Sequence, residues 1–184
     1  MWGGAFDHRP HFFINMLENF IRCAAYLVAI SALIYILGRL LPYSAIREDN
    51  FPFAPRPFER QGRFYLKLGV KRWKPFYPDA SIVIHKIIKA VPEKNLKGPS
   101  AGKLQVLIKE SCKAELTHLL ALFAAIPCPI FFSWPGAILG GLYFLINLPA
   151  IVIQRYNRPR LLRAAARLLQ KTPKPRRQFT SLIS

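Results

Sequence analysis

The feature that most limits the fold of this chain is an almost uninterrupted apolar stretch of about thirty-five residues, from Leu119 to Ile153. Residues 133–136, Ser-Trp-Pro-Gly, divide it into two arms of about eighteen residues, near the lower limit for a helix that crosses a bilayer. We therefore expect a hydrophobic helical hairpin over residues 113–153, which either crosses the membrane twice or dips in and returns. The second arm contains small residues that would let the arms approach closely: Gly136, Gly140 and Gly141.

Polar side chains stand at both ends of this hairpin. Glu115 and His118 come at its entrance, and the stretch Gln154-Arg155-Tyr156-Asn157-Arg158 follows its second arm. Whether the arms cross or re-enter, both ends of the hairpin lie on the same side. We therefore expect titratable and anion-binding side chains to gather at one depth of the bilayer.

The composition also indicates a membrane protein, because 52% of the residues are hydrophobic while the formal net charge is +18. A soluble domain of 184 residues does not usually combine these two properties. Residues 20–42 are apolar except for two arginines near the ends, which can snorkel, so we predict a membrane-spanning helix there. Residues 1–19 are rich in aromatic side chains and are predicted to form an interfacial segment.

Residues 43–112 are expected to form a basic domain at the membrane surface. A proline-rich strap over residues 51–58 cannot continue a helix and is predicted to lie extended along the surface. The spacing of apolar residues predicts amphipathic helices over Ser81–Val91 and Leu104–His118, the second running on into the hairpin.

Residues 154–184 are predicted to form a basic helix and tail, with Pro159 as a break before an interfacial helix over Arg160–Gln170. Lys and Arg accumulate in cytoplasmic segments, so the middle domain and the C-terminus are assigned to the cytoplasm. The predicted fold is an all-α, multi-pass integral protein of the cell membrane. It has about three hydrophobic helices, amphipathic interfacial helices and a basic cytoplasmic domain.

Glu115 and His118 are candidates for catalysis. They are three residues apart, so they share a face if the segment is helical. A carboxylate beside an imidazole fixes the tautomer of the ring and raises its basicity, as a general base acting on an alcohol requires. The alternative is a helix-entry pair at the headgroup level that only terminates the span.

The exit of the hairpin is a candidate binding site for an anionic substrate. Arginine forms bidentate bonds to phosphate, although a basic flank of a membrane span is the simpler alternative. The predicted binding residues here are Gln154, Arg155, Tyr156, Asn157 and Arg158.

The middle domain would contribute to binding only if it packed back on the hairpin. Trp73 is as easily an anchor at the membrane interface as a substrate contact. The predicted contributors are Glu59, Arg72, Trp73 and Lys74.

Several other kinds of site are not expected. Three cysteines without a Cys-x-x-Cys pair predict neither a disulfide framework nor a metal site. No nucleophile-elbow, Walker or dinucleotide-binding pattern is present, so we expect no cofactor. The mixed aromatic and cationic run over residues 58–79 suits an anionic leaflet better than RNA, so no nucleic-acid partner is expected.

Specific strings resemble a known family. They are F-E-R-Q-G-R-F-Y at 58–65, V-K-R-W-K at 70–74, K-A-E-L-T-H at 113–118 and I-V-I-Q-R-Y-N-R-P-R-L at 151–161. In order and spacing, over roughly residues 20–170, the chain resembles the glycosyl-4,4′-diaponeurosporenoate acyltransferase family of staphyloxanthin-type carotenoid biosynthesis. The resemblance implies a membrane enzyme that esterifies a sugar hydroxyl of a glycosylated carotenoid with a fatty acyl chain. Glu115 and His118 match the E-L-x-H motif of the family, and residues 154–158 match its basic exit motif.

The leading hypothesis is therefore an acyltransferase at the cytoplasmic face. His118, oriented by Glu115, would deprotonate an acceptor hydroxyl. Arg155 and Arg158 would hold the phosphate of an acyl-thioester donor such as acyl-CoA, or stabilise the oxyanion. The expected partners are the lipid membrane, this donor, and a lipid-like or carotenoid-glycoside acceptor, and a homo-oligomer is compatible with the sequence.

Two alternatives remain open from the residues alone. One is a non-catalytic basic membrane protein that binds anionic lipid or a partner enzyme. The other is a lipid-modifying transferase of different chemistry, such as methyl transfer.

Overall fold

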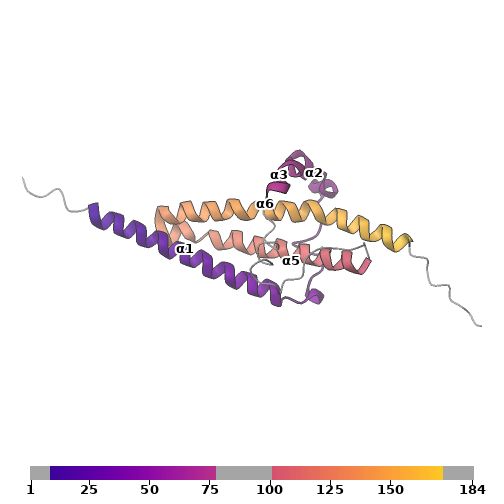
Figure 1. Cartoon of the computed structure of the whole chain (residues 1–184), viewed down its shortest axis with the longest axis horizontal. Coiled ribbons are helices and arrows are strands. Elements are labelled where there is room, and N and C mark those ends of the chain that lie inside the picture. The colour runs from indigo at the N-terminus through magenta and orange to yellow at the C-terminus, as the bar shows by residue number, and fades with distance from the viewer. Residues whose placement is uncertain (1–8, 78–100, 172–184) are drawn as a thin grey trace, which may run out of the picture.

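The computed structural model describes residues 9–77 and 101–171, and within these ranges the chain forms helices and no strand. Three long helices lie side by side: α1 (Arg9–Leu40), α5 (Ala101–Ala125) and α6 (Cys128–Lys171) (Figure 1). This confirms the predicted all-α class. The predicted helix over Ser81–Val91 and the tail after Lys171 lie outside the described residues. Five short helices follow α1: η1 (Tyr43–Ala45), η2 (Pro57–Gly62), α2 (Arg63–Lys67), α3 (Val70–Trp73) and η3 (Lys74–Phe76).

Helices α5 and α6 form the predicted hairpin, but its turn begins earlier than residues 133–136. Helix α5 ends at Ala125, where Pro127 has no N–H with which to extend the hydrogen-bond ladder. The reversal is completed at Phe132 and Ser133, whose backbone is not helical; Ser133 has φ 55°. The predicted helix from Leu104 does run without a break into the first arm.

Two of the three hairpin glycines allow the close approach expected from the sequence. A Cβ atom on Gly136 would overlap the carbonyl oxygen of Cys128, and one on Gly140 would lie 2.9 Å from the Cys128 Cβ. Nothing lies within 4 Å of the corresponding position on Gly141. The turn is therefore packed against one face of the second arm.

Replacing Gly136 by alanine is expected to destabilise the protein by about 1–3 kcal/mol, because the new methyl group meets backbone that cannot move aside. The matched control is Gly141→Ala, which fills open space and is expected to be neutral or stabilising, by up to about 1 kcal/mol. Thermal unfolding of the two detergent-solubilised variants measures the difference. Equal unfolding temperatures for both variants would refute the packing described for the turn.

Helix α1 lies along the hairpin from its tip to its open end. Near the tip, Tyr26 Oη donates a hydrogen bond to the Ala124 carbonyl at 3.0 Å. Near the open end, a Cβ on Gly38 would be only 2.5 Å from Thr117 Cγ2. The helix predicted over residues 20–42 extends further toward the N-terminus than expected, since α1 starts at Arg9.

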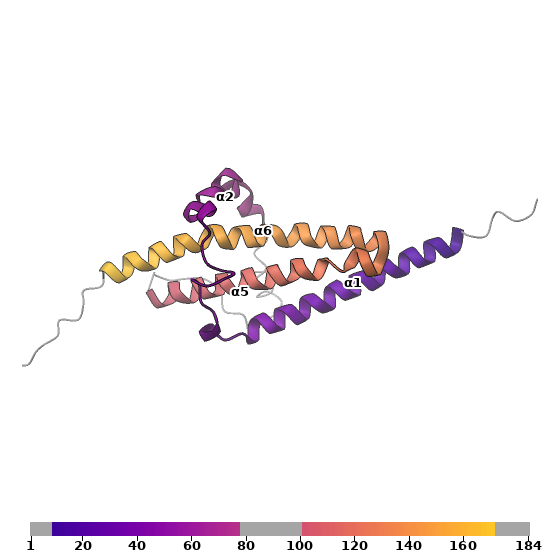
Figure 2. The same ribbon diagram turned by 180° about the vertical axis from the view of Figure 1, so that it is seen from behind.

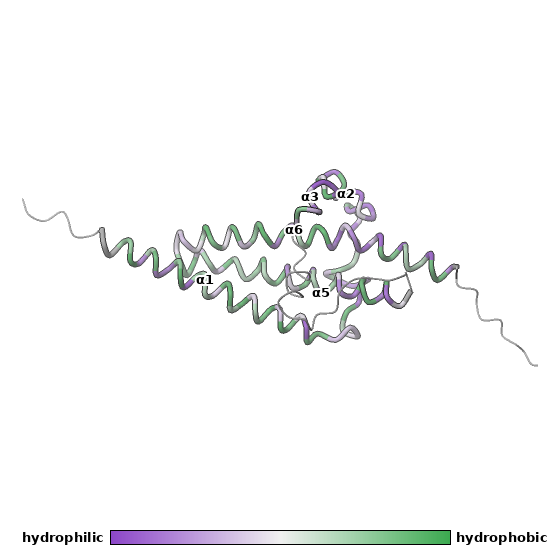
Figure 3. The backbone as a smooth tube through the Cα atoms, viewed as in Figure 1, coloured by the Kyte–Doolittle hydropathy of each residue, from purple (hydrophilic) through white to green (hydrophobic). Residues whose placement is uncertain are grey.

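The outer surfaces of α1 and α6 are suited to lipid. Large apolar side chains point outward from both helices, among them Val28, Leu33, Ile130, Phe131, Leu145 and Ile146. Phe12–Leu40 and Cys128–Gln170 are long and apolar enough to cross a membrane. Hydrophilic stretches gather instead in α2, α3 and the C-terminal part of α6 (Figure 3).

The predicted break at Pro159 is wrong, because α6 continues through it to Lys171. Proline removes one hydrogen bond from the helix, but packing on α5 outweighs that loss. Ala165 is buried against Leu104 and Ile108, with further leucines of α6 beside them. Leu169 of α6 is exposed, whereas three other leucines of this helix pack in the cluster: Leu161, Leu162 and Leu168.

Residues 57–77, here called the cap, pack across α6, and Figure 2 shows them over its middle from behind. Tyr65 and Val70 of the cap are buried against Tyr156 of α6. At the end of the cap, Tyr77 Oη donates a hydrogen bond to the Ile146 carbonyl at 2.7 Å. The strap that precedes the cap is not confined to the surface as predicted, since Phe53 is buried.

Candidate active site

An ion cluster closes the open end of the hairpin. Arg155 Nε donates to Glu115 Oε1 at 2.6 Å, and Arg158 donates to the other carboxylate oxygen of Glu115. Arg155 also forms an ion pair with Glu59 of the cap. The prediction that the entrance and the exit of the hairpin meet is confirmed, and the cap joins them there.

Backbone carbonyls of the strap complete the arginine contacts. Arg155 donates to the Pro52 carbonyl, and Arg158 donates to the Phe53 carbonyl at 2.9 Å. Arg158 also donates to the Ser111 carbonyl of α5 at 3.3 Å. The strap is thus fixed between the hairpin and the cap by the same two side chains that bind the glutamates.

Tyr65 holds the cap glutamate from the other side. Its hydroxyl donates to Glu59 Oε1 at 2.8 Å, and the Arg56 backbone N–H donates to Glu59 Oε2 at 3.2 Å. Burial in the first place, and then the bond to Glu59, raise the pKa of the Tyr65 hydroxyl well above its usual value. Tyr65 therefore remains a neutral donor to the carboxylate at physiological pH.

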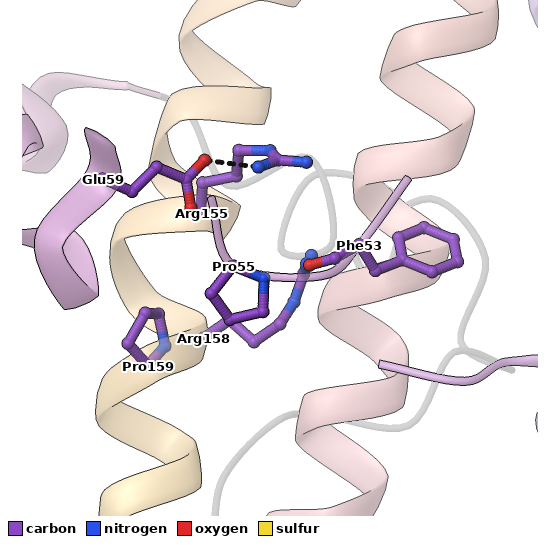
Figure 4. Close-up of a pocket in the computed structure, with 6 residues that line it drawn as sticks. All are labelled: Phe53, Pro55, Glu59, Arg155, Arg158 and Pro159. Atoms are coloured by element: carbon purple, nitrogen blue, oxygen red, sulfur yellow. Dashed lines mark hydrogen bonds and ion pairs between the residues drawn. The ribbon is translucent and has the colours of Figure 1, made fainter. Parts of the chain in front are cut away.

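The cluster is deeply buried and formally neutral. Glu59, Glu115 and Arg158 are each 2–3% exposed, and their charges and that of Arg155 cancel. A charge buried to this degree is tolerated only when it is paired and hydrogen-bonded. Figure 4 shows the pocket beside the cluster, where Glu59 and Arg155 point toward each other. Its lining consists of Phe53, Pro55, Glu59, Arg155, Arg158 and Pro159.

The turn that follows Glu59 is strained. Arg60, Gln61 and Gly62 have φ values of 46°, 55° and 89°, so three successive residues are left-handed. For each residue other than glycine this conformation costs about 1–3 kcal/mol. The turn rests on α6, because a Cβ on Gly62 would lie 3.4 Å from the Tyr156 carbonyl oxygen. It places Glu59 and Tyr65 on the same side, facing Arg155.

His118 lies one helical turn further into the hairpin and has a different partner from the one expected. Its Nδ1 is 2.8 Å from Asn147 Oδ1 of α6. The predicted pairing with Glu115 is wrong, because both oxygens of that carboxylate are bound by arginines. A buried carboxylate needs cationic partners, which a neutral imidazole does not supply.

The remaining predicted site residues lie around the cap. Lys74 Nζ donates to Asn157 Oδ1 at 2.9 Å. Trp73 packs with the buried Tyr156, and its Nε1 donates to the Leu68 carbonyl at 3.0 Å. Arg72 is exposed and Gln154 is half-buried. The cap thus reaches α6 through Lys74 and Trp73, whereas Arg72 lies outside this contact.

The contribution of Asn147 was not predicted from the sequence. It is a buried amide within an apolar arm, and such a polar residue in a membrane span commonly has a functional partner. Within residues 9–77 and 101–171, no group of three or more His, Cys, Asp or Glu side chains is placed to hold a metal ion.

Comparison with known proteins gives a consistent result. The family model for glycosyl-4,4′-diaponeurosporenoate acyltransferase matches residues 49–167. The protein of that name from Staphylococcus aureus strain MRSA252 is 30% identical over 157 residues, covering 80% of this chain and 91% of the relative. Its counterpart from strain bovine RF122 / ET3-1 is 29% identical over 144 residues, covering 76% and 83%. No solved structure matches the chain. The region matched by the family model contains the whole ion cluster, His118 and Asn147.

Proposed function

This chain belongs to the glycosyl-4,4′-diaponeurosporenoate acyltransferase family, and from that premise we propose that it esterifies a hydroxyl of a glycosylated carotenoid with a fatty acyl group at the cytoplasmic face of a membrane. The observation that carries the proposal is the position of His118. It lies where the apolar hairpin meets the buried ion cluster, within one helical turn of Glu115.

Both substrates of such a reaction are amphiphiles. The acyl donor and the glycosylated carotenoid each carry a long apolar chain and a polar reactive end, so their reacting atoms meet near the membrane interface. His118 is at this boundary: the apolar arms lie on one side of it, and the charges of Glu115 and Arg155 lie on the other. The outward apolar faces of α1 and α6 leave room for the chains in the bilayer.

The reaction that fits this position is base-assisted acyl transfer. His118 accepts the proton of the sugar hydroxyl while the hydroxyl oxygen attacks the acyl carbonyl carbon of a thioester. The ester C–O bond forms and the thioester C–S bond breaks. The leaving thiolate then takes the proton back from His118. The products are the ester and a free thiol, and the only co-substrate needed is acyl-CoA or another acyl thioester.

The contacts of the two arginines favour a supporting role over the phosphate-binding or oxyanion role expected from the sequence. All three guanidinium nitrogens of Arg155 donate to protein acceptors, on Glu115, Glu59 and Pro52. We propose that Arg155 and Arg158 hold the cap and the strap onto the hairpin. The polar part of the donor would then meet cations on the surface of α6 such as Arg160, which is exposed.

Two arginines of α1 mark the two ends of the proposed membrane crossing. Arg39 stands near the open end of the hairpin, and Arg22 pairs with Glu18 at 2.6 Å near its tip, where Cys23 packs against Cys128. The seventeen-residue rise between the two arginines is about 26 Å, close to the thickness of the hydrocarbon core. This supports α1 as a helix that crosses the membrane, with the basic cap and the end of α6 in the cytoplasm.

The test is to express the chain in cells that make the glycosylated carotenoid but lack its ester. Mass spectrometry of the pigments is expected to show a new species heavier by one fatty acyl group. Cells carrying the empty vector provide the control. A gain of a methyl mass, or no mass change while the protein is present in the membrane, would refute acyl transfer.

A further inference from the structure

The amide of Asn147 has two defined contacts. Its Nδ2 donates to the Tyr143 carbonyl at 2.8 Å, and its Oδ1 lies 2.8 Å from His118 Nδ1. Asn147 is only 9% exposed and belongs to an otherwise apolar arm of α6. A buried amide in such a place is costly unless its hydrogen-bonding groups are satisfied. Its two contacts, one to a backbone atom and one to the imidazole, therefore fix its position.

These contacts determine the direction of the hydrogen bond to His118. If the amide oxygen and nitrogen of Asn147 were exchanged, two oxygens that only accept would face each other at the Tyr143 carbonyl. The amide nitrogen must therefore face Tyr143, and the amide oxygen must face His118. Because this oxygen accepts and cannot donate, the proton of the neutral imidazole is on Nδ1.

We propose that Asn147 is a positioning residue for acyl transfer, which holds His118 in the tautomer whose Nε2 is unprotonated. This inference rests on the proposed function, in which His118 is the base. Nε2 then carries the lone pair that accepts the proton of the sugar hydroxyl. In the described part of the chain Nε2 has no hydrogen-bond partner, and the His118 side chain is half-buried rather than fully enclosed.

Contacts of Tyr143 and Asn147 hold the three long helices together around His118. The Tyr143 hydroxyl lies 2.8 Å from Ser31 Oγ of α1, so the residue that orients Asn147 is tied to the first helix. Asn147 itself ties α6 to α5 through His118. The three long helices are thus connected by polar contacts at the depth of the imidazole. Glu115, the carboxylate nearest to His118 along α5, is engaged by arginines and does not compete with Asn147.

The experiment combines activity with a direct observation of the tautomer. In protein labelled with ¹⁵N-histidine, the His118 signal is expected to show a protonated Nδ1 and an unprotonated Nε2. Asn147→Ala is expected to lose this preference and at least about tenfold in kcat, with little change in KM for the acceptor. Asn147→Asp keeps an acceptor oxygen for His118 but loses the donor to the Tyr143 carbonyl, so it is expected to recover only part of the rate. Leu145→Ala, on the exposed face of α6, is the matched control and is expected to keep the wild-type rate.

The outcomes separate this inference from the proposed function. If Asn147→Ala changes the tautomer but the rate stays at the wild-type level, His118 is not the base and the proposed function loses its mechanism. If His118→Ala is inactive while Asn147→Ala changes neither tautomer nor rate, Asn147 has no positioning role. If Asn147→Ala does not fold, Asn147→Asp decides: the inference is overturned if its rate is as low as that of His118→Ala, or if its His118 no longer carries the proton on Nδ1.

Discussion

Replacement of His118 by alanine is expected to lower the rate of acyl transfer by roughly 100- to 10,000-fold, the range over which a positioned general base acts. The proposed proton acceptor disappears, and no other described side chain takes its place beside Asn147. The variant is expected to remain inserted and folded, because only one hydrogen bond of a half-buried side chain is lost. That loss leaves Asn147 without one partner, at a cost of about 1–3 kcal/mol.

The measurement is turnover in membranes that contain equal amounts of wild-type and variant protein, with thermal unfolding as the check on folding. Gln105→Ala provides the control, since this residue is exposed on the same helix. A His118→Ala variant that works within about twofold of wild type would remove the base from the proposed mechanism.

Replacement of Glu115 by glutamine is expected to cost about 3–5 kcal/mol of stability, the usual penalty for removing one partner of a buried ion pair. Glu59 would then be the one carboxylate left in the cluster. It would have to balance the charges of two guanidinium groups, those of Arg155 and Arg158. The cap and the strap would then lose part of their attachment to the hairpin.

The matched control for this variant is Glu18→Gln. It removes an ion pair of similar length, the 2.6 Å contact between Arg22 and Glu18. The side chain of Arg22 is 65% exposed and that of Glu18 is 48% exposed. Exposed pairs contribute about 0–1 kcal/mol, so this change is expected to be nearly silent. Chemical unfolding in detergent micelles compares the two variants. Equal losses would mean that the buried cluster contributes no more than a surface pair.

The helices could be predicted because a long apolar segment in lipid must satisfy its backbone internally. The hairpin between residues 113 and 153 followed from this rule. Its turn starts earlier than predicted, because Pro127 ends α5 before the Ser-Trp-Pro-Gly segment, in which Ser133 completes the reversal. The expected stop at Pro159 failed for a different reason: burial of Ala165 against α5 stabilises the helix beyond the proline.

The location of the site could be predicted from the sequence, but the pairing of its side chains could not. Glu115, His118, Arg155 and Arg158 were found because polar residues flank apolar arms. Which of them pair depends on the rotation of α5 against α6, and the sequence does not carry that information. Asn147 could have been identified as the amide within an apolar arm. The Pro52 and Phe53 carbonyls could not, because a backbone acceptor has no characteristic residue type.

The ion cluster also implies an order of assembly. The hydrogen bonds of Arg155 and Arg158 join residues 40 to 105 positions apart in the sequence. The strap and the cap leave the ribosome before α5 and α6, so Glu59 cannot pair with Arg155 until α6 has been made. Docking of the cap through these contacts therefore requires that α6 has already been made.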